Sequence, residues 1–190
     1  NNWQALIKPS KLKLISDEDT QYKATLIAEP LERGFGLTLG NAIRRILLSS
    51  LQGAAITSVK LKGVVHEFST IPGVKEDLTD ILLNLKSVAV KVHSSGLKKM
   101  YLKSSGSGEL RAGNFETDSE TEIMNPDQLI MTLDSNAEIE IEANVETGKG
   151  YVSAEVAEDE NKVIGEIKLD AMFSPIIKTS YKVENSRVGQ

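Results

Sequence analysis

Residues 31–53 read LERGFGLTLGNAIRRILLSSLQG, and this stretch decides the fold of its part of the chain. Its main side chains recur at three- and four-residue spacing, which places them along one face of a helix. These residues are Leu39, Ile43, Ile46, Leu47 and Ser50. Thr38 is a suitable N-cap, and Gly53 suits the left-handed position that follows a helix. The pattern therefore predicts a helix from Leu39 to Gln52.

Two adjacent arginines, Arg44 and Arg45, interrupt this apolar helix. Because neighbouring helical residues point about 100° apart, both arginines cannot lie on the apolar face. Arg45 shares a side with Leu48, and an Arg beside an exposed Leu suits the anchor of a protein interface. A solvated helix face is the alternative. The surplus of apolar residues around Leu47 favours burial on two sides, by the chain's own sheet and by another subunit.

The rest of the chain alternates mainly in the manner of β-strands. The predicted strands are a hairpin within 8–28 that turns at 17–19 and packs one face inward, then 55–62, 88–93, 137–145, 163–169 and 176–183. A second amphipathic helix is marked by Val74, Leu78, Ile81, Leu82 and Leu85. Residues 94–107 are predicted to be hairpin and loop, and 126–133 a short helix or strand. This order lacks the regular strand–helix alternation of a parallel sheet, so the fold class is α+β.

Composition narrows the setting. The 190 residues contain no cysteine, which excludes disulfides, thiol catalysis and cysteine-based metal sites. No apolar run approaches the roughly 20 residues that span a bilayer, and the first residues show no signal-peptide pattern. A cytoplasmic location is therefore expected, with no membrane partner.

The net charge of −5 is unevenly distributed. Residues 113–160 carry 14 Asp and Glu against a single basic residue, Lys149. An acidic lobe repels phosphate backbones, so direct nucleic-acid binding is disfavoured. A well-solvated surface is the simpler explanation of the same charges.

Sites for catalysis are hard to find in this sequence. The glycines of 34–40 precede a helix, but their spacing is neither the dinucleotide fingerprint nor a P-loop, so they are interpreted as a tight approach to the helix. A nucleotide-binding protein that uses this loop is the alternative function. His66 and His93 are the only histidines and make a poor metal site without cysteine. The carboxylates of 76–77 and 158–160 are explained by a helix start and by solvent.

Two blocks carry a resemblance to a known family. The first is the quoted stretch through Leu51, and the second is residues 63–86, GVVHEFSTIPGVKEDLTDILLNLK. Both resemble the amino-terminal domain of the alpha subunit of bacterial-type DNA-directed RNA polymerase. Weaker similarity follows at 148–152, 170–175 and 181–190.

The resemblance implies two interlocked lobes. A dimerisation lobe, 1–52 plus 171–190, would hold a long amphipathic helix, and 53–170 would form an inserted, mostly antiparallel β lobe. Two copies would pair and form the platform on which the beta and beta-prime catalytic subunits assemble for transcription. The implied role is that of a non-catalytic subunit of a nucleotidyltransferase, in a bacterium or a plastid, without a cofactor or metal of its own. The family continues beyond the last residue here into a further helix and a DNA-binding domain, so no direct nucleic-acid contact is expected from this stretch.

The resemblance also implies three sets of contact residues. The dimer face would comprise Leu39, Ile43, Ile46, Leu47 and Ser50. The beta-subunit contact would comprise Arg44, Arg45, Leu48, His66, Glu67, Phe68, Ser69 and Thr70. The beta-prime contact would comprise Lys149, Tyr151, Asp170, Ser174 and Pro175.

Overall fold

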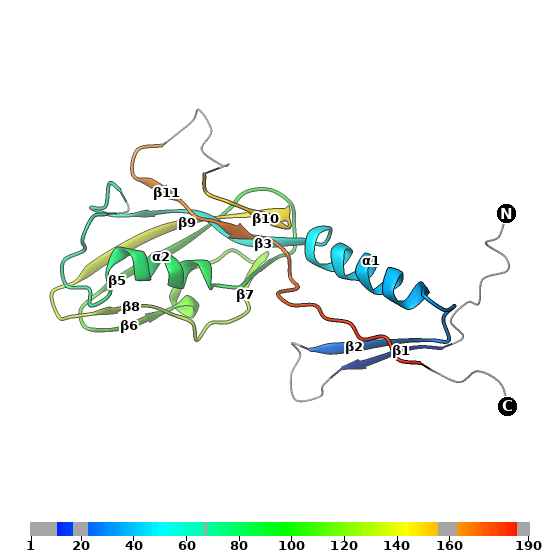
Figure 1. The fold of residues 1–190 in the computed structure, drawn as a ribbon. Helices are drawn as coiled ribbons and strands as arrows, with labels where there is room; N and C mark the ends of the chain where they lie inside the picture. Colours follow the sequence, from blue (N-terminus) through cyan, green and yellow to red (C-terminus); the bar gives the residue numbers. More distant parts are fainter. Residues whose placement is uncertain (1–10, 17–22, 67, 156–162, 186–190) are drawn as a thin grey trace. The chain divides into compact units, whose positions relative to one another are not determined.

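The computed structural model describes residues 11–16, 23–66, 68–155 and 163–185. The chain divides into two compact units (Figure 1). Unit 1 comprises Asn1–Ile46 and Lys178–Gln190, and unit 2 comprises Leu47–Ile177. Three features interpreted from the sequence lie outside the described residues, namely the turn at 17–19, Glu67 and the acidic run 158–160.

Unit 2 is built on a six-stranded antiparallel sheet in the order β5-β9-β3-β4-β7, with β11 paired to β3. These strands are β3 (Gln52–Leu61), β4 (Val90–Val92), β5 (Lys98–Ser105), β7 (Thr121–Ile123), β9 (Glu138–Lys149) and β11 (Glu166–Lys168). Two smaller sheets pair β6 (Gly108–Arg111) with β8 (Leu129–Leu133), and β10 (Tyr151–Val152) with β12 (Ala171–Met172). The fold is α+β and mostly antiparallel β, as predicted.

Strand β9 lies between β5 and β3 in this sheet and pairs with both. Ile139, Ile141 and Val145 are buried, whereas Glu138 and Glu140 between and beside them are exposed. This alternation is what a strand with one core-facing side requires. It confirms the strand predicted at 137–145, which in the structure continues to Lys149.

Helix α2 (Leu78–Lys86) covers part of this core. It begins after Asp77, whose carboxylate accepts a hydrogen bond from the backbone N–H of Asp80 at 2.9 Å. Leu78, Ile81 and Leu85 are buried on its inner face. The predicted apolar stripe is thus confirmed, except that Val74 precedes the helix and pairs with β8 through an isolated bridge.

Unit 1 contains the hairpin β1 (Lys11–Ser16) and β2 (Ala24–Glu29) and the larger part of helix α1 (Phe35–Ser49). The hairpin prediction is confirmed, with Lys11 paired to Glu29 and Leu14 to Leu26. The expectation that one hairpin face packs inward is wrong for this chain, because Leu14 is 70% exposed and Leu26 53% exposed. No helix in the described ranges is long and apolar enough to cross a membrane.

Helix α1 begins and ends earlier than predicted. Gly34 adopts a φ of 82°, and the N–H of Phe35 donates to the carbonyl of Glu32 at 3.0 Å, so the turn precedes Phe35. Thr38 is therefore inside the helix and not its N-cap. The helix stops at Ser49 because Gln52 already belongs to β3, which also places Gly53 in a strand.

Two predictions differ from the structure. Residues 94–107 are predicted to be hairpin and loop, but Lys98–Ser105 form one continuous strand, β5, which pairs with β9 and places Met100 and Leu102 in the core. Residues 176–183 were expected to form a strand, but no strand is present among the described residues beyond β12. The open choice at 126–133 resolves to strand β8.

Candidate protein–protein interface

Two glycines within α1 form a notch for the end of the chain. A Cβ on Gly36 would lie 3.1 Å from Val183, and one on Gly40 would lie 2.5 Å from the ring of Tyr181. The hydroxyl of Tyr181 donates to Oδ1 of Asn41 at 2.7 Å, which fixes the ring over the helix. The glycines expected to form a tight approach to the helix therefore lie inside it, except Gly34, and serve close packing.

The apolar face of α1 remains incompletely covered. The described chain buries none of its residues fully. Of the predicted dimer face, Leu39, Ile43 and Leu47 are half-buried, whereas Ile46 and Ser50 are exposed. Ile46 is 53% exposed. The predicted face therefore consists of three half-buried residues and an open margin formed by Ile46 and Ser50.

The arginines extend that open margin. Arg44 and Arg45 are both exposed, and Leu48 beside them is half-buried. A guanidinium presents planar donors and an apolar flank, both of which a partner protein can use. The helix therefore offers apolar and cationic contact area on adjoining positions.

A second candidate contact lies in the loop before α2. The backbone N–H of Phe68 donates to Nδ1 of His66 at 3.1 Å, and the N–H of Ser69 donates to the His66 carbonyl at 3.1 Å. These bonds form a tight turn whose apex exposes 83% of Phe68. His66 thus serves the turn through its ring and carbonyl, while Ser69 is half-buried and Thr70 exposed.

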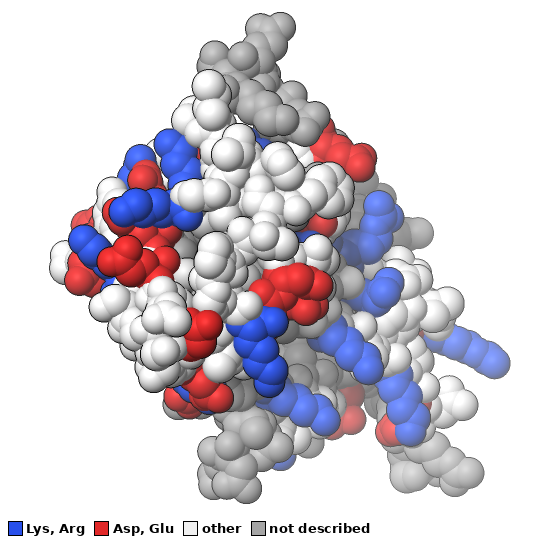
Figure 2. All heavy atoms as spheres, turned by 90° about the vertical axis from the view of Figure 1, so that its left-hand side faces the viewer, with Lys and Arg blue, Asp and Glu red and all other residues white. Residues whose placement is uncertain are grey.

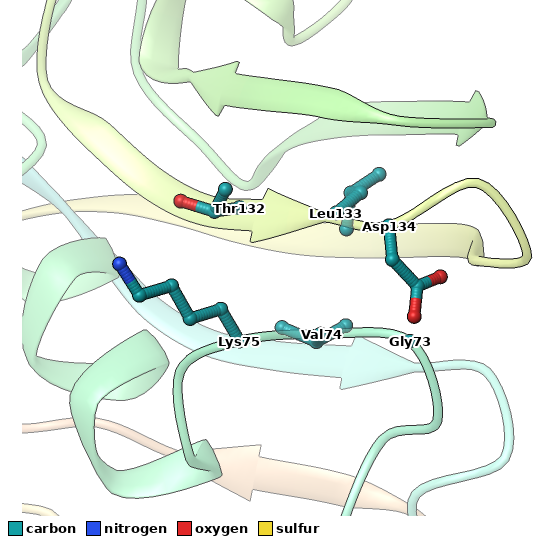
Figure 3. Close-up of a pocket in the computed structure, with 6 residues that line it drawn as sticks. All are labelled: Gly73, Val74, Lys75, Thr132, Leu133 and Asp134. Atoms are coloured by element: carbon teal, nitrogen blue, oxygen red, sulfur yellow. The ribbon is translucent and has the colours of Figure 1, made fainter.

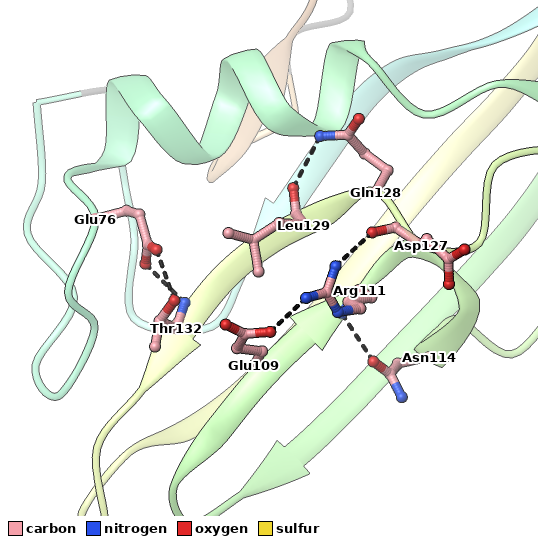
Figure 4. Close-up of polar contacts among 8 residues, drawn as sticks. All are labelled: Glu76, Glu109, Arg111, Asn114, Asp127, Gln128, Leu129 and Thr132. Atoms are coloured by element: carbon pink, nitrogen blue, oxygen red, sulfur yellow. Dashed lines mark hydrogen bonds and ion pairs between the residues drawn. The ribbon is translucent and has the colours of Figure 1, made fainter.

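Glu76 anchors the far end of this loop to the small β6–β8 sheet (Figure 4). Its carboxylate accepts hydrogen bonds from the backbone N–H and the hydroxyl of Thr132, at 2.7 and 2.8 Å. Burial by itself raises the pKa of Glu76. The hydrogen bonds from Thr132 lower this pKa by more than burial raises it, so the net shift is downward. On the same sheet Arg111 bridges Glu109 and the carbonyl of Asp127, which ties β6 to the chain before β8.

A third group of candidate residues surrounds a buried aromatic ring. Gly53 and Gly148 face each other across β3 and β9, and Phe173 lies in the notch between them, only 7% exposed. A Cβ on Gly148 would lie 2.8 Å from this ring, and a Cβ on Gly53 would lie 1.8 Å from the Phe173 carbonyl oxygen. Both glycines are visible in the sequence, but no local pattern indicated that Phe173 packs against them.

Ser174 follows in the same segment and is itself buried. Its hydroxyl donates to the carbonyl of Leu47 at 3.2 Å and accepts from the N–H of Ile176 at 3.3 Å. Ser174 therefore holds the segment against the last turn of α1, and the neighbouring Pro175 is exposed. Of this pair, only Pro175 lies at the surface of the chain.

Asp170 organises the surface next to that notch. It accepts hydrogen bonds from the N–H of Ala154 at 2.8 Å and from Nζ of Lys86 at 3.1 Å. These bonds, the one from Ala154 first, lower the pKa of Asp170. Beside it, Tyr151 pairs across the strands with Met172, and both side chains are more than half exposed. Met172 is not among the predicted contact residues, although its alternation with buried Ala171 and Phe173 indicates an exposed position.

An open hollow of about 340 Å³ lies between the segment before α2 and strand β8, and Gly73, Lys75 and Asp134 are among the residues that line it. Figure 3 shows these residues. Within the described ranges no group of three or more His, Asp and Glu could hold a metal ion. The residues of the proposed nucleotide loop, 34–40, form a turn and the start of α1, which leaves no open glycine loop there.

Charges on unit 2 are mixed in sign. Figure 2 shows acidic and basic side chains intermingled on one face of the molecule. Lys99 of β5 lies 2.6 Å from Glu142 of β9, and Lys98 lies 2.8 Å from Glu120. Glu120 and Glu142, two of the acids counted in 113–160, are thus paired with lysines, so the described surface around them is mixed in sign.

Together these features define a class: a small antiparallel β protein whose candidate sites are exposed side chains and turns. A comparison with protein-family models identifies the particular family. The model described as RNA polymerase Rpb3/RpoA insert domain matches residues 59–174. The chain belongs to this family and contains an alpha-type subunit domain of a multisubunit RNA polymerase. It is thereby part of the machinery of DNA-directed transcription, within a nucleotidyltransferase complex.

Proposed function

We propose that this chain is a non-catalytic assembly subunit, which pairs with a second copy and forms the platform for the beta and beta-prime subunits. The cytoplasm of a bacterium, or a plastid, is the proposed setting. The proposal divides the chain into a dimerisation lobe, 1–52 plus 171–190, and an inserted lobe, 53–170. The boundaries of the two compact units lie close to this division and support it.

The observation that carries the proposal is the incompletely covered helix α1. A helix with an apolar stripe is stable in water when another element covers that stripe. None of the α1 residues is fully buried by this chain, and Ile46 is 53% exposed. The proposed dimer face is the set predicted from the resemblance, Leu39, Ile43, Ile46, Leu47 and Ser50.

The beta-type subunit is proposed to contact Arg44 and Arg45 of one copy, together with the turn that contains Phe68. The proposed residues are Arg44, Arg45, Leu48, His66, Phe68, Ser69 and Thr70, with Glu67 outside the described part. Aromatic and arginine side chains are the residues that most often dominate binding energy at interfaces, and Phe68 at 83% exposure is unusually open for its type.

The beta-prime-type subunit is proposed to contact the surface organised by Asp170. Lys149, Tyr151 and Pro175 are exposed there, and Ser174 contributes by holding the segment in place. This region shares no residue with the proposed beta contact, so the two large subunits can be tested separately.

Replacing Arg45 with alanine tests the beta-subunit assignment. The affinity of the Arg45→Ala variant for the beta-type subunit should fall roughly 30-fold, because an arginine at an interface contributes about 2 kcal/mol. The two proteins should then co-purify less completely than with the unchanged chain. Lys91→Ala, which removes an exposed cation from β4, is the matched control and should bind normally. Normal binding by Arg45→Ala would remove this residue from the interface, and light scattering of the chain alone tests pairing independently.

A further inference from the structure

Phe68 belongs to the loop that joins β3 to α2, and the core of unit 2 holds this loop on both sides of the aromatic ring. Before the ring, Val64 is buried, and its N–H donates to the carbonyl of Leu61 at 3.0 Å. After the ring, Ile71 is half-buried and packs against the same core. The 83% exposure of Phe68 therefore arises in a short segment between two residues that the core holds.

The loop ends as a short extended segment beside β8 (Figures 3 and 4). Val74 forms an isolated antiparallel bridge with Leu133, and the N–H of Lys75 donates to the carbonyl of Thr132 at 3.0 Å. In a regular antiparallel ladder the N–H of Thr132 would donate in return to a backbone carbonyl of the loop. Here this N–H donates instead to Oε2 of Glu76 at 2.7 Å, and the Thr132 hydroxyl donates to Oε1 at 2.8 Å.

A side-chain carboxylate serves as the acceptor because the backbone leaves the ladder at this point. Asp77 follows Glu76 directly and caps α2, which begins at Leu78. Removal of the Glu76 carboxylate would take this acceptor from the half-buried Thr132, and a buried donor without an acceptor is costly. The end of the loop would then depend on the backbone bonds of the bridge.

We infer that Glu76 and Thr132 are positioning residues for the turn that contains Phe68. Their paired hydrogen bonds fix the end of the loop, and thereby hold the exposed ring in one place before a partner arrives. A side chain that is already ordered loses less conformational freedom on binding, so affinity rises without a new contact. The inference rests on the proposed contact of Phe68 with the beta-type subunit.

The affinity of the whole chain for the beta-type subunit, measured by isothermal titration calorimetry, tests this role. Glu76→Ala should bind about tenfold more weakly, because the loop must then be ordered during binding. Glu76→Gln keeps an acceptor for the Thr132 N–H and should remain within about threefold of the unchanged chain. Two controls should bind normally: Glu138→Ala removes an exposed carboxylate from β9, and Ile167→Val slightly destabilises the core through β11.

A double-mutant cycle with Phe68 separates positioning from direct contact. Phe68→Ala should weaken binding roughly 30-fold. Adding Glu76→Ala to that variant should change the affinity by less than about twofold, because no ring remains to be positioned. Equal losses in both backgrounds, or normal binding by Glu76→Ala, would overturn the positioning role and leave the Phe68 contact intact. Normal binding by Phe68→Ala would overturn that contact and the inference together.

Thr132→Val carries the test if Glu76→Ala does not fold. This variant removes the hydroxyl but keeps the backbone donor and the shape of the side chain, and circular dichroism would verify that it is folded. It should bind about threefold more weakly, and the loss should vanish in the Phe68→Ala background. Normal affinity of a folded Thr132→Val variant would refute the paired hydrogen bonds as the device that positions the ring.

Discussion

Replacing Gly53 with alanine should be among the most damaging single substitutions in unit 2. The added Cβ would lie 1.8 Å from the carbonyl oxygen of Phe173, which is backbone and cannot rotate away. Relief of this contact requires a displacement of roughly 1 Å or more between β3 and the Phe173 segment. That displacement disrupts the bond from the Phe173 N–H to the Gly150 carbonyl, at 2.8 Å, and the bond from Ser174 to Leu47.

The expected magnitude follows from these losses. Removing a buried Phe side chain costs about 3–5 kcal/mol, and each hydrogen bond contributes about 1 kcal/mol. Because the ring would be displaced and not deleted, we expect Gly53→Ala to lower the free energy of unfolding by about 3 kcal/mol. Urea unfolding followed by far-UV circular dichroism would then show a midpoint lower by about 1.5 M, for an m-value of about 2 kcal/mol per M.

Two further variants separate the backbone contact from general glycine effects. Gly63 has a φ of 82° and no neighbour within 4 Å of an added Cβ, so Gly63→Ala should cost only backbone strain, about 1 kcal/mol. In a Phe173→Ala background, Gly148→Ala should become nearly harmless because its contact is with the ring, whereas Gly53→Ala should remain costly. A Gly53→Ala variant as stable as wild type, or one rescued by Phe173→Ala, would refute the assigned contact.

Three other predictions follow from single contacts. Gly40→Ala should displace the Tyr181 ring and cost about 1–2 kcal/mol, and hydrogen exchange should then rise in α1; unchanged exchange would contradict the notch. Asp77→Ala should cost about 1 kcal/mol by removing the N-cap of α2, and Asp77→Asn should retain most of that stability in thermal melting. Because the folded pKa of Glu76 is lowered, its contribution is present above the unfolded value near 4.5 and is lost as pH falls through the folded pKa; Glu76→Gln should flatten the acid limb of urea midpoints measured against pH, and an unchanged limb would exclude the role.

Local patterns predicted the strands in which every second residue is buried and the helices in which every third or fourth residue is buried. Strand β9 and helix α2 are of this kind, since Ile139 and Ile141, or Ile81 and Leu85, carry the signal themselves. Strand β5 was missed because the glycines and serines around it outweighed the alternation of Met100 and Leu102.

The start of α1 was misplaced for a different reason. Glycine is unfavourable within helices, so the predicted helix began at Leu39, after Gly36. Gly36 lies inside the observed helix, where it packs closely against Val183, a residue far away in sequence. No local rule contains that information.

The candidate interface was predictable only in part. Helical geometry indicated only that Arg44 and Arg45 cannot both lie on the apolar face, and the family resemblance supplied the turn near Phe68. The internal role of Ser174 could not be foreseen, because one of the partners of its hydroxyl is the carbonyl of Leu47 in another element.

The facing glycines of β3 and β9 also guard against mispairing. If one strand slipped by a single residue, Thr147 or Lys149 would stand opposite Gly53, and the gap that admits Phe173 would close. The aromatic ring can settle only on correctly aligned strands. A register shift between β3 and β9 would thereby also lose the packing of Phe173, which belongs to a segment far away in sequence.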